Sequence, residues 1–197
     1  MRKLIAVTGG IGSGKSTVTE IISSLNFPTI SCDAITQQLY KKQSVLRKIK
    51  KIIPSGVVGK LFLKPDKQRI AQVIFNDKLK YAEFTEFLTI LTLEKTLKLS
   101  KKFDGLVFVE VPLLFEFNAT KYFDDVIVVT RELSARIESV KTRSKLSTEQ
   151  IEERIKSQFD YENSDLSTYK IIPNNSTIKE LKQKTLEIIE QIKTDLN

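Results

Sequence analysis

The residues best suited to chemistry lie near the start of the chain, in the segment TGGIGSGKST (residues 8–17). Gly9, four further residues, and then Gly14, Lys15 and Ser16 match the phosphate-loop spacing G-x-x-x-x-G-K-[ST]. Glycines let backbone N–H groups approach a phosphate closely, and they precede the positive end of a helix. Lys15 can add charge at the outer phosphates, and the Ser16 hydroxyl can ligate Mg²⁺. The segment therefore predicts a nucleoside triphosphate site.

The alternative is an ordinary turn between a strand and a helix that happens to contain glycine. The flanking segments argue against it, because residues 3–7 form an apolar run that suits a buried parallel strand. Residues 16–25 then place apolar side chains at helical spacing. Four of the seven glycines of the chain fall in this one loop. Spacing and context together favour phosphate binding over the simple turn.

Two carboxylates lie at the ends of predicted strands. Asp33 comes directly after the segment 28–32, at the end of a strand where a parallel sheet also places the phosphate loop. Its carboxylate could accept a hydroxyl proton, or it could cap the following helix, and the residues leave both roles open. Glu110 ends the apolar segment 106–111, where an acidic residue can hold Mg²⁺ directly or through water. The alternative for Glu110 is a carboxylate without a special role.

Arginines recur in a charged helical segment, residues 131–158. Arg136, Arg143 and Arg154 could fold over a triphosphate as a lid and stabilise charge on a transferring phosphoryl group. The alternative is an exposed charged helix with pairs at i,i+4. Spacing alone favours the exposed helix.

Composition excludes several function classes. The chain has no histidine, which removes Ser-His-Asp triads, histidine bases and histidine metal ligands. A single cysteine, Cys32, excludes an internal disulfide framework and favours a cytoplasmic protein. No apolar run reaches the ~18 residues of a membrane span. The net charge of +8 fits a solvated lysine-rich face or an anionic partner, but no recognisable nucleic-acid motif is present, so no nucleic-acid or membrane partner is expected.

The 197 residues predict one α/β domain with a parallel sheet, because short apolar runs alternate with long helical patterns. More than seventy residues without a convincing strand separate the second and third runs, which predicts a mostly helical insertion. A final helix over about 177–196 is expected to pack one apolar face, which includes Ile178 and Leu196, on the core. The predicted strands are residues 3–7, 28–32, 106–111, 125–130 and 169–172.

Six segments along the chain form a recognisable set. They are TGGIGSGKST, CDAI around Asp33, RIAQVIFND (residues 69–77), PLLFE (residues 112–116), the arginine pattern ending at Gln158, and IIPNNST (residues 171–177). Together they resemble the dephospho-coenzyme A kinases, a family of P-loop kinases. The resemblance spans nearly the whole chain in order, and its combination of phosphate loop and PLLFE is more specific than the loop alone.

The resemblance implies a P-loop fold with a five-stranded parallel sheet flanked by helices, a helical substrate-binding insertion and a helical lid. It implies a nucleotide-binding core of residues 1–33, 104–135 and 169–197. Residues 34–103 would form the substrate-binding region and residues 136–160 the lid.

The resemblance also implies a reaction and its residues. The γ-phosphate of ATP would pass to the ribose 3′-hydroxyl of dephospho-coenzyme A, the last step of coenzyme A synthesis, with Mg²⁺ accompanying ATP. Asp33 would be the catalytic base, helped by Lys15 and Arg143. The residues implied to bind ATP are Gly10, Ile11, Gly12, Ser13, Gly14, Lys15, Ser16, Thr17, Arg143 and Asn174. Those implied to bind the acceptor are Thr8, Asp33, Lys67, Pro112, Leu113, Leu114 and Arg136. Ser16 would ligate Mg²⁺, with Glu110 acting through water.

The chain departs from the family pattern at four places. Ser31-Cys32-Asp33 replaces Asp-Ala-Asp, and Lys67 replaces an arginine. Thr89-Ile90 stands at the usual His-Pro, and Glu110 replaces an aspartate. The departures concern acceptor binding more than the phosphate loop.

Two other functions fit a phosphate loop. Another nucleoside or nucleotide kinase would share the loop and differ in its acceptor. A GTP switch is disfavoured because the chain contains no N-K-x-D run, and a nucleic-acid-associated ATPase would show turnover stimulated by RNA or DNA. The sequence does not indicate whether the protein is a monomer or a trimer.

Overall fold

The computed structural model describes residues 2–144 and 146–195. The chain forms two compact units, one built from Met1–Ser31 with Ser100–Asn197 and the other from Cys32–Leu99. Each unit is described by itself below.

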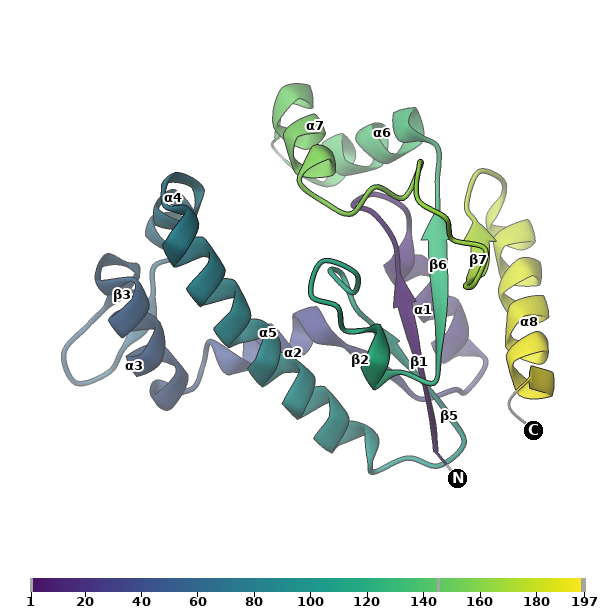
Figure 1. Ribbon diagram of the computed structural model, residues 1–197, viewed down its shortest axis with the longest axis horizontal. Helices are drawn as coiled ribbons and strands as arrows, with labels where there is room; N and C mark the ends of the chain where they lie inside the picture. Colours follow the sequence, from purple (N-terminus) through teal and green to yellow (C-terminus); the bar gives the residue numbers. More distant parts are fainter. Residues whose placement is uncertain (1, 145, 196–197) are drawn as a thin grey trace. The chain divides into compact units, whose positions relative to one another are not determined.

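The first unit is built on a five-stranded parallel sheet with the order β2-β5-β1-β6-β7 (Figure 1). All five predicted strands are confirmed, and their ends differ from prediction by a residue or less. A sheet of this kind needs helical crossovers, which explains the alternation of apolar runs and helical patterns in the sequence. The strands are β1 (Lys3–Thr8), β2 (Thr29–Ser31), β5 (Leu106–Glu110), β6 (Asp125–Thr130) and β7 (Lys170–Pro173).

The register of the sheet brings the ends of three strands together. Glu110 of β5 lies opposite Val7 of β1 on one side and opposite Ser31 of β2 on the other. The segments that follow β1, β2 and β5 therefore all leave the sheet at one edge. That edge is where open α/β sheets bind ligands.

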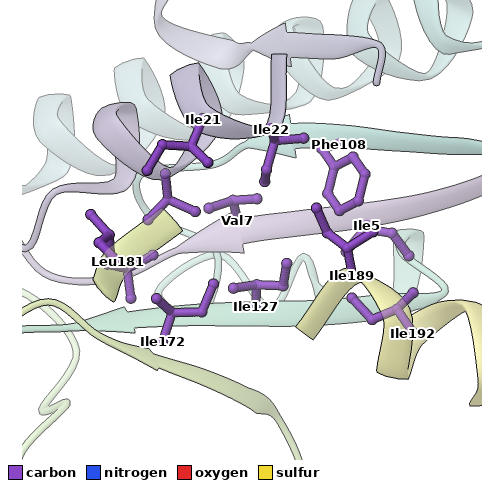
Figure 2. Packing of buried hydrophobic residues seen from close by; sticks show 12 residues of the cluster. Ile5, Val7, Ile21, Ile22, Phe108, Ile127, Ile172, Leu181, Ile189 and Ile192 are labelled. Atoms are coloured by element: carbon purple, nitrogen blue, oxygen red, sulfur yellow. The ribbon is translucent and has the colours of Figure 1, made fainter. Parts of the chain in front are cut away.

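One face of the sheet is covered by helices α1 (Lys15–Ser24) and α8 (Ile178–Asp195). Figure 2 shows alternate strand side chains such as Val7 and Ile127 meeting Ile22 of α1 and Leu181 of α8. Alternation places every second strand residue on this face, and burial of such side chains is the main source of stability.

The expectation for the last helix is confirmed except at its start, because Ile178 is 64% exposed. The other predicted end of its apolar face, Leu196, lies outside the described residues.

Two short helices follow β6 in the first unit, α6 (Leu133–Arg143) and α7 (Thr148–Lys156). The start of α7 is fixed by a capping box, in which Ser147 accepts from the Gln150 amide and Gln150 accepts from the Ser147 amide. The segment PLLFE (residues 112–116) forms turns. A 3₁₀ turn, η2 (Thr120–Tyr122), then leads into β6.

The second unit is mostly helical, as the sequence predicts. Its two short strands pair as an antiparallel hairpin, which was not predicted from the sequence because each strand has only two residues. Asp66 caps α4 by accepting from the Arg69 amide. The elements are α2 (Cys32–Leu39), α3 (Gln43–Ile52), η1 (Pro54–Gly56), β3 (Val57–Val58), β4 (Lys64–Pro65), α4 (Lys67–Asn76) and α5 (Lys78–Ser100).

Candidate active site

The phosphate loop, residues 9–16, joins β1 to α1. Gly14 occupies the N-cap position of α1 with φ +96°, a conformation that favours glycine. Because glycine has no side chain, the first N–H groups of α1 are not capped by it and point out of the positive end of the helix. The Lys15 ammonium donates to the carbonyl oxygens of Gly9 at 2.7 Å and Gly10 at 3.1 Å. The loop thus gathers positive charge and N–H donors at one place, as a phosphate site requires.

Ser16 and Glu110 meet beside this loop. The Ser16 hydroxyl donates to the Glu110 carboxylate at 2.7 Å, although the two residues are 94 positions apart. A cavity of about 160 Å³ adjoins Glu110, lined also by Thr19 of α1 and Ser31 of β2. A hydroxyl and a carboxylate are hard oxygen ligands of the kind Mg²⁺ prefers, so these residues fit the ion. Within residues 2–144 and 146–195, no cluster of three histidine, cysteine or acidic residues is found.

Arg136 of α6 lies buried against the phosphate loop, with 4% of its surface exposed. Its Nε donates to the Ile11 carbonyl at 3.0 Å, and its Nη1 donates to the Glu162 carboxylate at 2.6 Å. The exposed-helix interpretation of the arginine segment is therefore wrong for Arg136, because its side chain is buried and its guanidinium donates to Ile11 and Glu162. The contact was not foreseen from spacing, since the partner carbonyl is 125 residues away.

The close packing explains two of the loop glycines. A Cβ on Gly10 would lie 2.4 Å from Nη2 of Arg136, and a Cβ on Gly12 would lie 2.5 Å from the Arg136 carbonyl oxygen. Gly12 also has φ +78°, so a side chain there would be strained as well as crowded. These glycines serve the fit of α6 against the loop.

Asn174 contacts the other side of the loop. Its Nδ2 donates to the Ser13 carbonyl at 2.8 Å, and its backbone N–H donates to Thr130 at the end of β6. A Cβ on Gly14 would lie 2.2 Å from the same Nδ2. Asn174 thus lies against the backbone of the phosphate loop, as its predicted place near the nucleotide requires. Its contact with ATP stays a prediction.

The segment after α7 makes further contacts that were not predicted from the sequence. Gln158 Oε1 accepts from the Ile11 amide at 2.7 Å. The Tyr161 hydroxyl lies 3.3 Å from the hydroxyl of Thr8, the last residue of β1. Burial raises the pKa of Tyr161 to about 12, because the phenolate would lose its hydration. The phenol therefore keeps its proton at any working pH.

Arg143 lies at the exposed end of α6, two helical turns beyond Arg136. It lines a hollow of about 540 Å³ together with Arg131, Ala135, Glu138, Ser139 and Thr142. Nε of Arg131 is buried and has no hydrogen-bond partner among the residues that the structure describes. The hollow therefore offers two guanidinium groups to an anion, and its volume is in the range of small-molecule sites.

Pro112, Leu113 and Leu114 form the turn after β5. Leu114 is fully buried and packs in the core, whereas Pro112 and Leu113 are half-buried. Only the latter two therefore present side-chain surface to a ligand.

Asp33 and Lys67 belong to the second unit. Asp33 is exposed and lies in the first turn of α2, which begins one residue earlier. The capping alternative placed it before the helix, so that interpretation is wrong, and its charge instead lies at the favourable end of the helix dipole. Lys67 is exposed at the start of α4, with its ammonium 6.0 Å from the Tyr40 ring centroid. Burial raises the pKa of Tyr40.

A family model described as dephospho-CoA kinase matches residues 3–180, most of the chain. The chain belongs to the dephospho-CoA kinase family. The match runs from the first strand β1 through the phosphate loop and α6 to the start of α8. It therefore includes both units.

Individual relatives and solved structures support the same family assignment. A protein of Fusobacterium nucleatum subsp. nucleatum named dephospho-CoA kinase is 29% identical over 96% of this chain and 98% of its own length. The solved structure of the dephospho-CoA kinase of Campylobacter jejuni has a TM-score of 0.69 and 29% identity, covering the full length of both chains. A Thermus thermophilus crystal structure has a TM-score of 0.84 and 25% identity over 96% of this chain and 97% of its own. The fold is that of a P-loop kinase.

Proposed function

We propose that this chain transfers the γ-phosphoryl group of ATP to the ribose 3′-hydroxyl of dephospho-coenzyme A, giving ADP and coenzyme A. The observation that carries the proposal is the match of the dephospho-CoA kinase family over residues 3–180. The phosphate loop alone would leave the acceptor open, because every P-loop kinase has one.

The first unit is proposed to bind ATP. The β- and γ-phosphates lie in the loop Gly10, Ile11, Gly12, Ser13, Gly14, Lys15, Ser16 and Thr17, where N–H groups and the Lys15 ammonium neutralise their charge. Arg143 and Asn174 complete the nucleotide site. The arginine-lined hollow and the contact of Asn174 with the Ser13 carbonyl support these two roles.

Mg²⁺ is proposed to accompany ATP. Ser16 would be its protein ligand, and Glu110 would hold it through water, since the hydroxyl and the carboxylate already lie together. When bound, Mg²⁺ supplies positive charge to the phosphate oxygens.

The second unit is proposed to bind the acceptor, with Lys67 among its contacts and Pro112 and Leu113 contributing side-chain surface from the first. Thr8, Leu114 and Arg136 are buried, so their contacts with the acceptor stay predictions. Residues 32–99 contain 14 lysines and arginines but only 6 acidic residues, so they carry the whole formal net charge of +8. Dephospho-coenzyme A carries a diphosphate, and a basic unit attracts such an anion.

In the reaction the bond between the γ-phosphorus and the bridging oxygen breaks, and a bond to the 3′-oxygen of the ribose forms. Asp33 accepts the hydroxyl proton, and Arg143 stabilises negative charge as it moves onto the leaving ADP. Helices α6 and α7 act as a lid that keeps water, a competing acceptor, away from the γ-phosphate.

A cytoplasmic location stays a prediction, supported by the single cysteine. In the described residues, 2–144 and 146–195, no helix combines the length and apolar character needed to span a bilayer.

The proposal is tested by incubating the purified protein with Mg-ATP and dephospho-coenzyme A and separating the products by chromatography. Coenzyme A and ADP should form in equal amounts. The Lys15→Ala variant is the matched control, because it removes the loop ammonium. Absence of coenzyme A at high enzyme concentration would contradict the proposal.

A further inference from the structure

The tip of the phosphate loop is held at a single residue, Ile11. Its N–H donates to Gln158 Oε1 at 2.7 Å, and its carbonyl accepts from Arg136 Nε at 3.0 Å. Both backbone polar groups of Ile11 are thus satisfied by side chains from residues far along the chain. Because the N–H and the carbonyl of Ile11 are each bonded to a side chain, a different conformation of the tip would break both hydrogen bonds. The arrangement therefore favours one conformation of the tip.

Arg136 is itself fixed from the same segment that supplies Gln158. Its Nη1 donates to Glu162 Oε1 at 2.6 Å. The Arg136 side chain is 4% exposed and that of Glu162 is 51% exposed. A buried guanidinium needs a paired charge, and Glu162 provides it. Glu162 therefore reaches the loop tip indirectly, through Arg136.

The segment between these two residues is anchored in the first unit. The Phe159 amide donates to Glu116 Oε1 at 2.9 Å, and the Tyr161 hydroxyl lies beside Thr8. The rings of Phe159 and Tyr161 pack on Phe115, with centroids 4.5 Å and 5.8 Å away. Residues 158–162 thus contact the strand before the loop, the turn after β5 and the loop tip. We call this segment the strap.

We propose that the strap holds the tip of the phosphate loop in its nucleotide-binding shape, with Gln158 and Glu162 as positioning residues. Neither residue is required to touch ATP. Gln158 fixes the Ile11 amide directly, and Glu162 fixes the Ile11 carbonyl by orienting Arg136. The proposal rests on the proposed function only in that the loop binds a nucleoside triphosphate.

A blocking role for Gln158 would change the nucleotide affinity in the opposite direction from a positioning role. If Gln158 merely occupied an N–H group that a phosphate must take, removing its side chain would free that group and tighten nucleotide binding. A positioning role predicts weaker binding, because ATP must then order the loop at its own cost. The direction of the change in affinity separates the two.

The test measures the affinity of each variant for a non-hydrolysable ATP analogue by calorimetry, well below the unfolding temperature of that variant. Gln158→Ala removes the side-chain amide, and Gln158→Asn shortens the side chain by one methylene. Each should weaken binding of the analogue by about fivefold, the scale of one ordinary hydrogen bond. Gln183→Ala is the matched control, because Gln183 is exposed on α8 and bonds only to Glu187 among the contacts described. Unchanged or tighter binding by both Gln158 variants would overturn the proposal.

Glu162 supplies the second arm. Glu162→Gln keeps an oxygen for Arg136 and should bind the analogue more tightly than Glu162→Ala. In a double-mutant cycle, Gln158→Ala and Glu162→Ala should lose less together than the sum of their separate losses, since both act on Ile11. Strictly additive losses of affinity in this cycle, or equal affinity of Glu162→Gln and Glu162→Ala, would overturn the proposed role of the strap. Because these readouts need no acceptor, failure of the strap is distinguishable from failure to form coenzyme A.

Discussion

Gly12 illustrates how a loop glycine can have two uses. Its backbone belongs to the phosphate loop, and the space where a Cβ would stand is filled by the Arg136 carbonyl oxygen. A motif-based interpretation gives the first use and not the second. The glycine is thus required by the packing of α6 as much as by phosphate.

Gly12→Ala should lower both the free energy of unfolding and ATP affinity, because it adds a backbone clash to an unfavourable φ. Gly105→Ala is the matched control, since Gly105 has φ +70° but nothing lies within 4 Å of its added Cβ. Gly105→Ala should lower the free energy of unfolding by about 1–2 kcal/mol, because of the left-handed conformation alone. Gly12→Ala should lower it more. Denaturant unfolding and calorimetry measure both, and equal losses of stability would contradict the packing role.

Asp33→Asn should leave affinity for the ATP analogue nearly unchanged and lower turnover at least ~10²-fold, the scale of lost general-base help. The amide keeps the size of the side chain but cannot accept the hydroxyl proton. Steady-state kinetics with saturating ATP measure the loss, and Asp104→Asn, at an exposed position in the segment before β5, is the control. Near-normal turnover would make Asp33 an orienting residue.

The residues of the site divide according to how they are fixed. Lys15 and Ser16 could be predicted because their positions follow from local spacing along one loop. Glu110 was predicted as a strand end, but its 2.7 Å contact with Ser16 depends on the pairing of β5 with β1. Gln158 and Tyr161 were missed as loop contacts because their partners lie about 150 residues earlier and no periodic pattern encodes such pairs.

At the scale of elements, the predicted strands were correct because strongly apolar runs bounded by polar turns leave little ambiguity. The hairpin of β3 and β4 was missed, since two residues per strand give no detectable alternation. Helix α6 shows why the exposed-helix interpretation was wrong for Arg136 but agrees with the exposure of Arg143. It turns Arg136 into the fold and leaves Arg143 exposed at its last turn, although both share one charged sequence pattern.

Arg143→Lys should lower turnover by about tenfold, because lysine keeps the charge but loses the planar fork that binds two phosphate oxygens at once. Lys141→Ala, in the same last turn of α6, is the control, since Lys141 does not line the 540 Å³ hollow. Initial rates at saturating substrates are compared for Arg143→Lys, Lys141→Ala and the unmodified protein. A loss as large for Lys141→Ala as for Arg143→Lys would remove Arg143 from the phosphate site.

Across the whole molecule, charge is divided unequally between the two units. The unit Cys32–Leu99 holds the entire formal net charge of +8, so the remainder of the chain is formally neutral. From the sequence, the net charge of +8 was interpreted as a solvated lysine-rich face or as a sign of an anionic partner, without a division of the charge between units. Such a division is visible only when the structure defines which residues form each unit.

Acceptor capture should therefore depend on ionic strength. With ATP saturating, kcat/KM for dephospho-coenzyme A should fall several-fold between about 50 and 300 mM NaCl, because salt screens a basic unit from its anionic ligand. Choline chloride serves as the control for a specific sodium effect. A flat profile would contradict the proposed role of the basic unit.

The proposed function depends above all on the identity of the acceptor. The most direct measurement compares initial rates with dephospho-coenzyme A, adenosine, AMP and water as acceptors, at one concentration of enzyme and Mg-ATP, and locates the new phosphate by ³¹P NMR. Dephospho-coenzyme A should be the preferred acceptor, and its product should carry the new phosphate on the 3′-oxygen. Faster transfer to adenosine or AMP, or ATP hydrolysis without any acceptor product, would contradict it.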